Sequence, residues 1–299
     1  TLIQNKDKAI ISKKLVTLKK DVPIKIKISE FKLKEINKDR LYNFLREMEF
    51  NRLLSSVIST YGDINFKDKN KDFDNKQKKQ NISKNNYQLI TKVEEIDKFL
   101  NEAEENGEIA IDTETSSLDA HQAKLIGISL STKIGKACYI PIGHKTGINL
   151  DEKTVVQKIK PILEDQSIKK IGQNIKFDFI ILYKRGISMN AMEDTMLMSY
   201  VLDAGKNRHN MDTLSQIHLG HKTISFKDLV GTGKKQINFS EVEIDKAKDY
   251  AAEDADITYR LYKLFSKSLK LEKLLNIYEI FEKPLIKILA LMEVRGIKV

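Results

Sequence analysis

Four acidic residues in three separated segments of the chain could bind divalent cations together. Asp112 and Glu114 stand in Ile-Ala-Ile-Asp-Thr-Glu-Thr, Asp178 in Gln-Asn-Ile-Lys-Phe-Asp, and Asp254 in Tyr-Ala-Ala-Glu-Asp-Ala-Asp. Like charges disfavour one another's ionisation, so carboxylates that converge need a counter-charge. Hard divalent cations take oxygen ligands, and a pair of such ions is a recurrent device for cutting phosphodiester bonds. The four acids therefore predict a metal-dependent nuclease.

The spacing of the first two acids places them on one face of a strand. In a β-strand the side chains at i and i+2 share a face, so Asp112 and Glu114 point the same way at the end of an apolar strand. Ile109 and Ile111 then face the opposite side. A plain structural interpretation stays open, in which the two acids are exposed residues at a strand terminus.

The other two acids lie on predicted helices. Asp178 stands at the start of a helix that follows an apolar strand over 168–172, and Asn174 is a plausible cap residue for that helix. Because helix N-termini favour negative charge, Asp178 could also be a purely structural acid. Tyr250 and Asp254 are four residues apart and share one helix face. The tyrosine could orient an attacking water, or it could be a half-buried helix residue with an exposed hydroxyl.

The apolar periodicity from residue 89 onward predicts an α/β domain in which a mixed sheet is flanked by helices. Two of its strands have the spacing of a β-meander, broken by Lys133-Ile-Gly135. We expect strands over 108–112, 125–131, 136–141 and 168–172, and helices over 93–103 and 151–164, from about 175, 190, 211 and 241, and over 271–294.

Residues 1–60 are interpreted as a smaller, mostly helical remnant of a preceding domain. Alternation in Pro23-Ile-Lys-Ile-Lys-Ile28 predicts a strand with one solvated face, and apolar spacing predicts a helix over 39–58. Residues 61–88 are rich in Lys, Asp and Asn with few apolar residues. Such a composition buries too little surface to offset the entropy lost on ordering. We therefore interpret 61–88 as a flexible basic linker, and contact of this tether with DNA stays open.

Composition limits the class of protein and its surroundings. The 299 residues carry a formal net charge of +10, which fits nucleic acid as a partner, although a bias toward lysine along the whole chain would give the same charge. The single cysteine, Cys138, rules out an internal disulfide and favours a reducing cytoplasm. No apolar run approaches the ~20 residues that span a bilayer, and no signal-peptide pattern is present. Because the sequence begins with Thr1, we expect a fragment of a longer protein, and nothing indicates more than a monomer.

The order of the acidic motifs resembles that of the DEDD superfamily of 3′–5′ exonucleases, whose motifs are D-x-E, N-x-x-x-D and Y-x-x-x-D. The tyrosine, where a sister branch has histidine, is similar to the DEDDy type. The resemblance implies a ribonuclease H-like fold. The three motifs stand here as Asp112-Thr-Glu114, Asn174-Ile-Lys-Phe-Asp178 and Tyr250-Ala-Ala-Glu-Asp254.

Longer phrases resemble the proofreading domains of the bacterial DNA polymerase I family (family A). The resemblance covers 89–270, which it implies is a 3′–5′ exonuclease domain. Residues 1–60 are similar to the end of the family's 5′-nuclease domain, and 271–299 to the first helix of its polymerase domain, whose remainder is absent from this chain. The phrases are Asp-Thr-Glu-Thr-Ser-Ser-Leu-Asp (112–119), Tyr-Ile-Pro-Ile-Gly-His (139–144), His-Asn-Met-Asp-Thr-Leu (209–214), His-Lys-Thr-Ile-Ser-Phe (221–226) and Tyr-Ala-Ala-Glu-Asp-Ala-Asp (250–256).

This resemblance implies a two-metal mechanism with Mg²⁺ or Mn²⁺. Asp112 would bridge both ions, Glu114 and Asp254 would complete the site of the first, Asp178 would hold the second, and Tyr250 would position the attacking water. The expected reaction is proofreading hydrolysis that releases 3′-terminal nucleotides as 5′-monophosphates. The implied partner is a single-stranded DNA 3′ end or a frayed primer terminus, in a bacterial cytoplasm and associated with the nucleoid.

The same resemblance implies four substrate contacts. Leu118 matches a leucine that wedges against the terminal bases, and Phe226 matches an aromatic residue that stacks near the 3′ end. Gln173 and Asn174 match polar groups near the terminal nucleotides. Stacking tolerates any base because every base has a π-face, which suits an editing enzyme. Core packing of Leu118 and Phe226 is the competing interpretation.

Two other functions compete with the proofreading exonuclease. An exoribonuclease of the ribonuclease D type shares the four acids and the tyrosine. A catalytically silent scaffold that binds DNA or braces a polymerase would keep the fold without the activity. Phe177 stands where the family often has tyrosine, and Phe179 where it often has a polar residue, but we expect activity to survive both departures.

Overall fold

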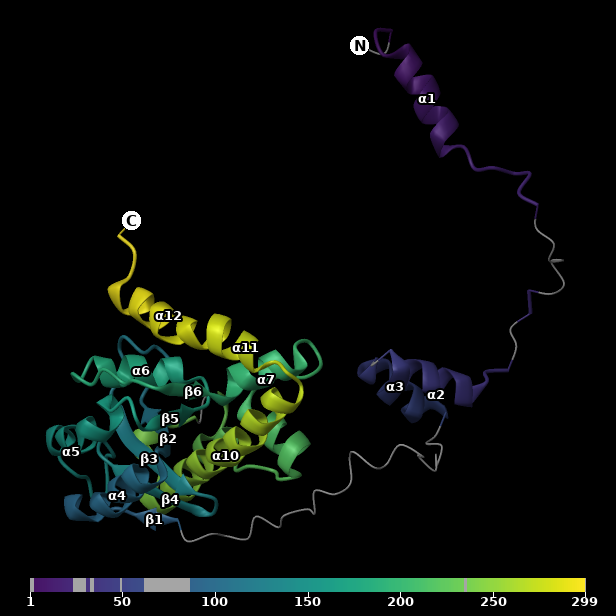
Figure 1. The fold of residues 1–299 in the computed structure, drawn as a ribbon. Helices are drawn as coiled ribbons and strands as arrows, with labels where there is room; N and C mark the ends of the chain where they lie inside the picture. Colours follow the sequence, from purple (N-terminus) through teal and green to yellow (C-terminus); the bar gives the residue numbers. More distant parts are fainter. Residues whose placement is uncertain are drawn as a thin grey trace. The chain divides into compact units, whose positions relative to one another are not determined.

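The computed structural model describes residues 3–23, 31–32, 35–48, 50–61, 87–233 and 236–298 (Figure 1). The chain divides into two compact units, Thr1–Asp68 and Lys69–Val299. The strand predicted at 23–28 lies outside the described residues except for its first position, and so does nearly all of the linker predicted at 61–88.

The described part of the first unit contains three helices. The single helix predicted over 39–58 is wrong, because two helices pack against each other there. The chain turns between them so that the rings of Phe44 and Phe50 meet edge to face, with centroids 6.2 Å apart. The small core includes Tyr42 and Leu45. The helices are α1 Lys6–Val16, α2 Lys38–Glu47 and α3 Asn51–Tyr61.

The second unit is built on a six-stranded mixed sheet with the order β1-β4-β3-β2-β5-β6. The central strands β2, β3 and β4 form the predicted antiparallel meander. Strands β5 and β6 extend the sheet in parallel beyond β2, and β1 pairs in parallel with β4. The predicted ribonuclease H-like α/β class is confirmed. The strands are β1 Gln88–Leu89, β2 Glu108–Thr115, β3 Leu125–Lys133, β4 Lys136–Pro141, β5 Lys169–Gly172 and β6 Met192–Asp194.

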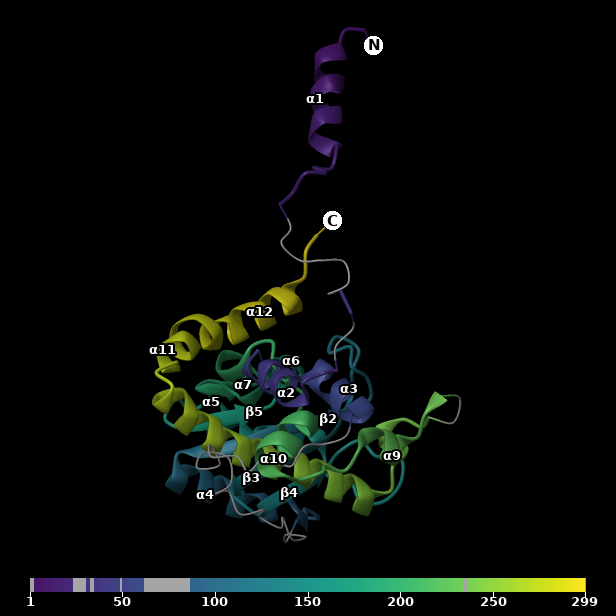
Figure 2. The same ribbon diagram turned by 90° about the vertical axis from the view of Figure 1, so that its right-hand side faces the viewer.

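Helices cover both faces of this sheet (Figures 1 and 2). On one face, α4 Asp97–Asn106, α5 Glu152–Glu164, α6 Ile175–Tyr183 and α12 Lys283–Arg295 bury an aliphatic core against alternate residues of β2 and β3. On the other face, the long helix α10 Ile244–Leu271 runs across β2, β3, β4 and β5, with α7 Thr195–Asp203 beside it. No helix in the described ranges is long and apolar enough to cross a membrane.

Two sequence expectations about element boundaries need correction. The helix expected from 190 begins at Thr195, because Met192–Asp194 pairs with β5 as a strand. The sequence Met-Glu-Asp has no pattern that predicts this strand. The segment expected as one helix over 271–294 is broken into short pieces before α12. The remaining short elements of the second unit are the 3₁₀ turns Val93–Ile96 and Phe239–Glu241, the helices α8 Met211–Leu214, α9 Phe226–Val230 and α11 Leu275–Ile277, and the π turns Ser215–Leu219 and Tyr278–Glu282.

Asp194, at the end of β6, caps the helix that carries Asp178. Its carboxylate accepts hydrogen bonds from the backbone N–H groups of Asn174 and Ile175 at 3.0 Å, and from that of Met196 at 2.9 Å in α7. Asn174 occupies the cap position with φ 59°, but its side chain makes no capping hydrogen bond. The predicted cap position of Asn174 is therefore confirmed, but the capping hydrogen bonds come from Asp194, and this one buried aspartate holds two helix N-termini together.

Asp194→Ala should destabilise the fold by about 3 kcal/mol, because it leaves the buried or partly buried N–H groups at the starts of α6 and α7 without an acceptor. Thermal or urea unfolding measures the change. Asp151→Ala is the matched control, since Asp151 caps only the exposed N-terminus of α5 through the N–H of Thr154 at 2.8 Å. We expect about 1 kcal/mol for that control. Equal losses in the two variants would contradict the double-cap interpretation.

Candidate active site

Strand β2 presents Asp112 and Glu114 toward helix α10. Ala110, on the same side of the strand, packs in the apolar cluster that includes the α10 residues. Ile109 and Ile111 pack in the cluster on the opposite face, as predicted from the alternation. The strand continues to Thr115, beyond its predicted end at residue 112, so both acids lie within it. Regular pairing with β3 through Glu114 fixes the direction of both carboxylates.

Helix α10 brings a third carboxylate to this position. Ligand atoms of Asp112, Glu114 and Asp254 all lie within 4.8 Å of one another. Glu114 and Asp254 are buried, whereas Asp112 keeps partial exposure to solvent. Three carboxylate oxygen donors at this separation have the composition of a site for a hard divalent cation.

Asp178 reaches the end of β2 from the helix layer on the other face of the sheet. Its Oδ1 accepts hydrogen bonds from the backbone N–H of Thr113 at 2.9 Å and from the Thr113 hydroxyl at 2.6 Å. Asp178 is not one of the three clustered acids, but burial and, after it, the charge of Asp112 raise its pKa. The middle residue of Asp-Thr-Glu therefore orients the fourth acid, while its two neighbours face the other way.

Burial disfavours ionisation of all four carboxylates, and repulsion between the acids adds to this effect for Glu114, Asp178 and Asp254. Burial raises the pKa of Asp112 to about 6. Burial also raises the pKa of Glu114, and the charges of Asp112, Asp254 and Asp178 add to that effect. Within the described chain, Oε1 of Glu114 is buried without a hydrogen-bond partner. An orphaned carboxylate oxygen amid three other acids fits a bound cation, which would supply the missing partner and counter-charge.

In the nuclease that the four acids predict, Thr113→Val should lower the turnover number by about tenfold with little change in KM. Valine keeps the shape of threonine but removes the hydroxyl that binds Asp178, and a hydrogen bond to a charged group contributes about 1.5–3 kcal/mol. Steady-state hydrolysis of an oligonucleotide measures both constants. Thr115→Val is the control, because the Thr115 hydroxyl donates to the exposed backbone oxygen of Ser117 at 2.9 Å. An unchanged turnover number in the Thr113 variant would show that Asp178 needs no such support.

Tyr250 lies one turn before Asp254 on α10 beside a group of aromatic rings. Its ring centroid is 6.0 Å from those of Phe226 and Phe239, and the latter two rings stack in parallel at 6.3 Å. Burial, followed by the charges of Asp254, Glu114 and Asp112, raises the pKa of the Tyr250 hydroxyl. The phenol therefore keeps its proton and serves as a hydrogen-bond donor at neutral pH.

The candidate substrate contacts differ in their surroundings. Leu118, in the loop after β2, is 94% exposed, and Phe226 is 42% exposed. Core packing is thus wrong for Leu118 and incomplete for Phe226. The amide of Gln173 is engaged within the protein, because its Nε2 donates to the His209 oxygen at 2.8 Å and its Oε1 accepts from Thr195 at 2.5 Å. Asn174 is exposed.

The two departures from the family pattern lie in the core. Phe179 is fully buried and stacks on Tyr183, with centroids 5.5 Å apart. Phe177 is partly buried and packs against the same aliphatic cluster. Their rings therefore support helix α6 rather than extend the carboxylate cluster.

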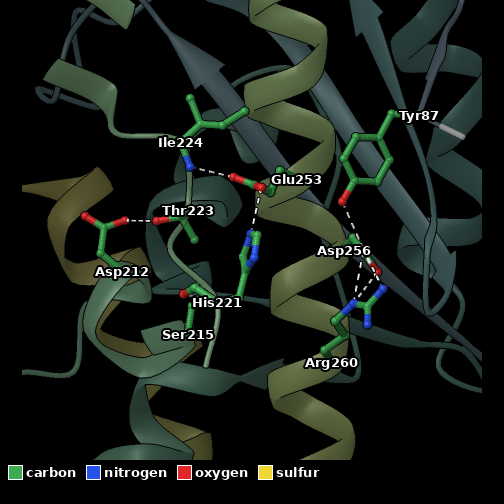
Figure 3. A network of polar contacts seen from close by, with 9 residues as sticks. All are labelled: Tyr87, Asp212, Ser215, His221, Thr223, Ile224, Glu253, Asp256 and Arg260. Atoms are coloured by element: carbon green, nitrogen blue, oxygen red, sulfur yellow. Dashed lines mark hydrogen bonds and ion pairs between the residues drawn. The ribbon is translucent and has the colours of Figure 1, made fainter. Parts of the chain in front are cut away.

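Two acids that flank Asp254 on α10 hold the surrounding segments, and the sequence did not assign them a role (Figure 3). Glu253 bonds to His221 and to the backbone of Ile224. Asp256 is fully buried, pairs with Arg260 at 3.0 Å and accepts from the N–H of Gly135 at 2.8 Å. The sequence signal for these roles was the presence of three acids, Glu253, Asp254 and Asp256, within four residues of one helix. Buried carboxylates require partners, so such a cluster indicates contacts with other segments.

Gly127 on β3, opposite Glu114, has no room for a side chain. A Cβ atom there would lie 2.1 Å from the Tyr139 hydroxyl oxygen. The Tyr139 hydroxyl forms a buried 2.7 Å hydrogen bond with Nε2 of His144, and burial, followed by the charge of Glu114, raises the pKa of Tyr139. Glycine on β3 thus allows a tyrosine–histidine pair to pack close to the acids.

Comparison with known proteins places this geometry in a family. A family model described as 3′–5′ exonuclease matches residues 87–270. DNA polymerase I of Rhizobium leguminosarum is 42% identical over 71% of this chain and 23% of its own length. DNA polymerase I of Pseudomonas aeruginosa is 35% identical over 99% of this chain and 32% of its own length. The chain thus spans about a quarter to a third of the length of these relatives.

Solved structures support the fold assignment. NrnC of Brucella melitensis with bound Mg²⁺ has a TM-score of 0.51 at 23% identity, covering 71% of this chain and 95% of that one. The POL domain of Pol1 from M. smegmatis, in complex with DNA primer-template and dNTP, has a TM-score of 0.56 at 19% identity, covering 71% of this chain and 32% of that one. Both share the sheet and helix arrangement of the second unit.

Proposed function

Because this chain belongs to the 3′–5′ exonuclease family of the DNA polymerase I proteins, we propose that it is a metal-dependent proofreading nuclease that removes 3′-terminal nucleotides from DNA as 5′-monophosphates. The observation that carries the proposal is the buried cluster of Asp112, Glu114 and Asp254, with one Glu114 oxygen lacking a partner among the described residues. The substrate is a single-stranded 3′ end or a frayed primer terminus.

Divalent cations, Mg²⁺ or Mn²⁺, are the cofactors of this proposal. Asp112, Glu114 and Asp254 would hold one ion, and Asp178, together with Asp112, would hold a second. When bound, the ions supply an activated water and stabilise the charge that develops on the scissile phosphate. Until they bind, burial and repulsion keep the pKa of these carboxyl groups raised.

The chain's own groups divide the remaining work of hydrolysis. Tyr250, which keeps its proton, donates a hydrogen bond that orients the attacking water against the terminal phosphodiester. Thr113 fixes the Asp178 carboxylate beside the leaving 3′ oxygen. Leu118 and Phe226 are both exposed. Leu118 wedges against the terminal bases, and Phe226 stacks on a base near the 3′ end.

The polar pair before α6 contributes to substrate binding in different ways in this proposal. Asn174 offers an exposed amide to the terminal nucleotide. Gln173, whose amide is engaged with His209 and Thr195, acts by shaping the edge of the site.

Digestion of a 5′-labelled single-stranded DNA, with Mg²⁺ or with EDTA, tests the proposal. We expect a ladder of products shortened one nucleotide at a time from the 3′ end, only when the metal is present. DNA that stays intact while remaining bound would favour the catalytically silent scaffold. A matched RNA of the same sequence distinguishes the ribonuclease D type of activity, and faster cleavage of RNA than of DNA would overturn the assignment of DNA as substrate.

The domain assignments extend the proposal to the longer protein. We assign 1–60 to the end of a 5′-nuclease domain, 61–88 to a linker, 89–270 to the exonuclease domain and 271–299 to the first helix of a polymerase domain. A cytoplasmic, nucleoid-associated monomer that proofreads its own DNA synthesis fits this arrangement. Strand β1 begins at Gln88, and the Tyr87 hydroxyl donates to Asp256 at 3.0 Å, which supports an exonuclease domain that begins at the end of the linker.

A further inference from the structure

A buried acid beside Asp254 ties helix α10 to the segment that leads into Phe226 (Figure 3). Glu253 is 7% exposed. One of its carboxylate oxygens lies 2.9 Å from Nε2 of His221, and the other accepts a hydrogen bond from the backbone N–H of Ile224 at 2.6 Å. Both oxygens of Glu253 therefore bind the 221–224 segment, so this carboxylate is already engaged within the protein.

The segment held by Glu253 is also anchored to the short helical region before it. The Thr223 hydroxyl donates to Asp212 at 2.6 Å, and the Ser215 hydroxyl donates to the backbone oxygen of His221 at 2.9 Å. These contacts leave the backbone of 221–224 little freedom. Two residues after Ile224, helix α9 begins at Phe226.

The anchored 221–224 segment fixes the position of Phe226, which follows it closely in the chain. Its ring lies parallel to Phe239, at an interplanar angle of 4°, and beside Tyr250, yet 42% of the residue stays exposed. The ring is thus held at the edge of the aromatic group, with surface left for another flat ring. Because Glu253 and Asp254 are adjacent on α10, the anchor sets the distance between that ring and the metal-binding acids.

We propose that Glu253 and His221 are positioning residues that hold Phe226 at the height where the 3′-terminal base stacks while Asp254 engages the scissile phosphate. This inference rests on the proposed exonuclease function. Neither residue touches the reacting atoms, so loss of the contact impairs binding of the DNA end and leaves the chemical step intact. A stacked base contributes about 5- to 150-fold in affinity, which sets the scale of the effect.

Kinetics of His221→Ala, His221→Gln and Phe226→Ala on single-stranded DNA test the inference. Alanine removes the partner of Glu253, whereas the glutamine amide nitrogen can occupy the place of Nε2 and donate to the same carboxylate. We expect His221→Ala to raise KM at least about fivefold with kcat within about twofold, and His221→Gln to restore KM. Thermal unfolding confirms that each variant is folded, and Thr223→Val replaces His221→Ala if the latter does not fold.

A double-mutant cycle separates positioning from general damage. If His221 acts through Phe226, the double variant His221→Ala, Phe226→Ala has the same KM as Phe226→Ala, within about twofold. Two results would overturn this inference but not the proposed function. One is a double variant in which the increases in KM of the two single variants multiply, and the other is a KM of His221→Ala equal to that of the unaltered protein. Failure of the unaltered protein to digest the DNA would instead overturn the proposed function, and this inference with it.

Discussion

Asp112→Asn is expected to abolish cleavage, by about a thousandfold or more, while making the metal-free protein more stable. Asp112 is the residue assigned to both ions, and the charge stabilisation that bound metals supply is worth several kcal/mol in the transition state. Each 1.36 kcal/mol is tenfold in rate. Digestion of single-stranded DNA with Mg²⁺ measures the loss, and thermal unfolding in EDTA measures the gain.

The gain in stability follows from the sign of the pKa shift. The pKa of Asp112 is raised in the folded protein from an ordinary 3.8 to about 6 by burial. The unfolded chain therefore ionises more readily, and the metal-free fold loses stability as pH rises through the interval between these two values. The full shift corresponds to about 3 kcal/mol. Because Asp112 keeps partial exposure, we expect asparagine to recover about 1–2 kcal/mol at pH 8 and almost nothing at pH 3.

Asp249→Asn is the matched control for this variant. Asp249 lies on the same helix as Asp254, but it is exposed and pairs with Lys248 at 3.1 Å. We expect its cleavage rate and its stability in EDTA to stay near those of the unaltered protein, since exposed ion pairs contribute little. Retained cleavage in Asp112→Asn would reject the metal site, and reduced stability in EDTA would reject the electrostatic account.

Ending the chain at residue 270 is expected to lower the unfolding temperature by more than about 10 °C or to prevent folding. The family match stops at that residue, but the segment after it packs into the same unit. Tyr278 is fully buried, and Ile286 and Ala290 of α12 belong to the aliphatic core over α6. Loss of one large buried side chain alone typically costs about 3–5 kcal/mol, so loss of the whole segment exceeds the margin of many domains.

Polar contacts of this segment involve Glu193 and Asp194 at the end of β6, next to the start of the helix that carries Asp178. The Tyr278 hydroxyl accepts from the N–H of Asp194 at 2.9 Å and donates to Glu193 at 3.0 Å. Lys283 pairs with the same glutamate at 2.6 Å. We therefore propose that the folded unit extends past the predicted boundary at 270, and that the segment assigned to the polymerase domain stabilises the exonuclease.

Two further protein variants serve as controls for the truncation at residue 270. Removal of 296–299 should leave the unfolding temperature unchanged, because the described residues 296–298 are exposed. Tyr278→Phe keeps the ring but removes the hydroxyl. It should cost about 2–3 kcal/mol, because Oε2 of Glu193 and the N–H of Asp194 lose their hydrogen-bond partner. An unchanged unfolding temperature for the chain ending at 270 would show that α12 only rests on the unit.

Local pattern in the sequence determined most of the elements and the core of the site. Alternation around Asp112 and Glu114 predicted a strand with both acids on one face, and four-residue spacing predicted Tyr250 and Asp254 on one helix face. These predictions hold because strand and helix periods act over a few neighbouring residues, and each period decides which side chains share a surface. The motif order indicated the family before any geometry was known.

Only the tertiary structure decided which distant groups became partners. Strand β6 pairs with the edge of β5. Asn174 is the N-cap residue of α6, but Asp194 accepts the hydrogen bonds there because folding brings β6 to the start of α6. Gln173 and Glu253 likewise took partners far along the chain. The sequence shows that a polar side chain needs a hydrogen-bond partner if it is buried, but it does not identify that partner. The partner depends on which groups the completed fold buries next to it.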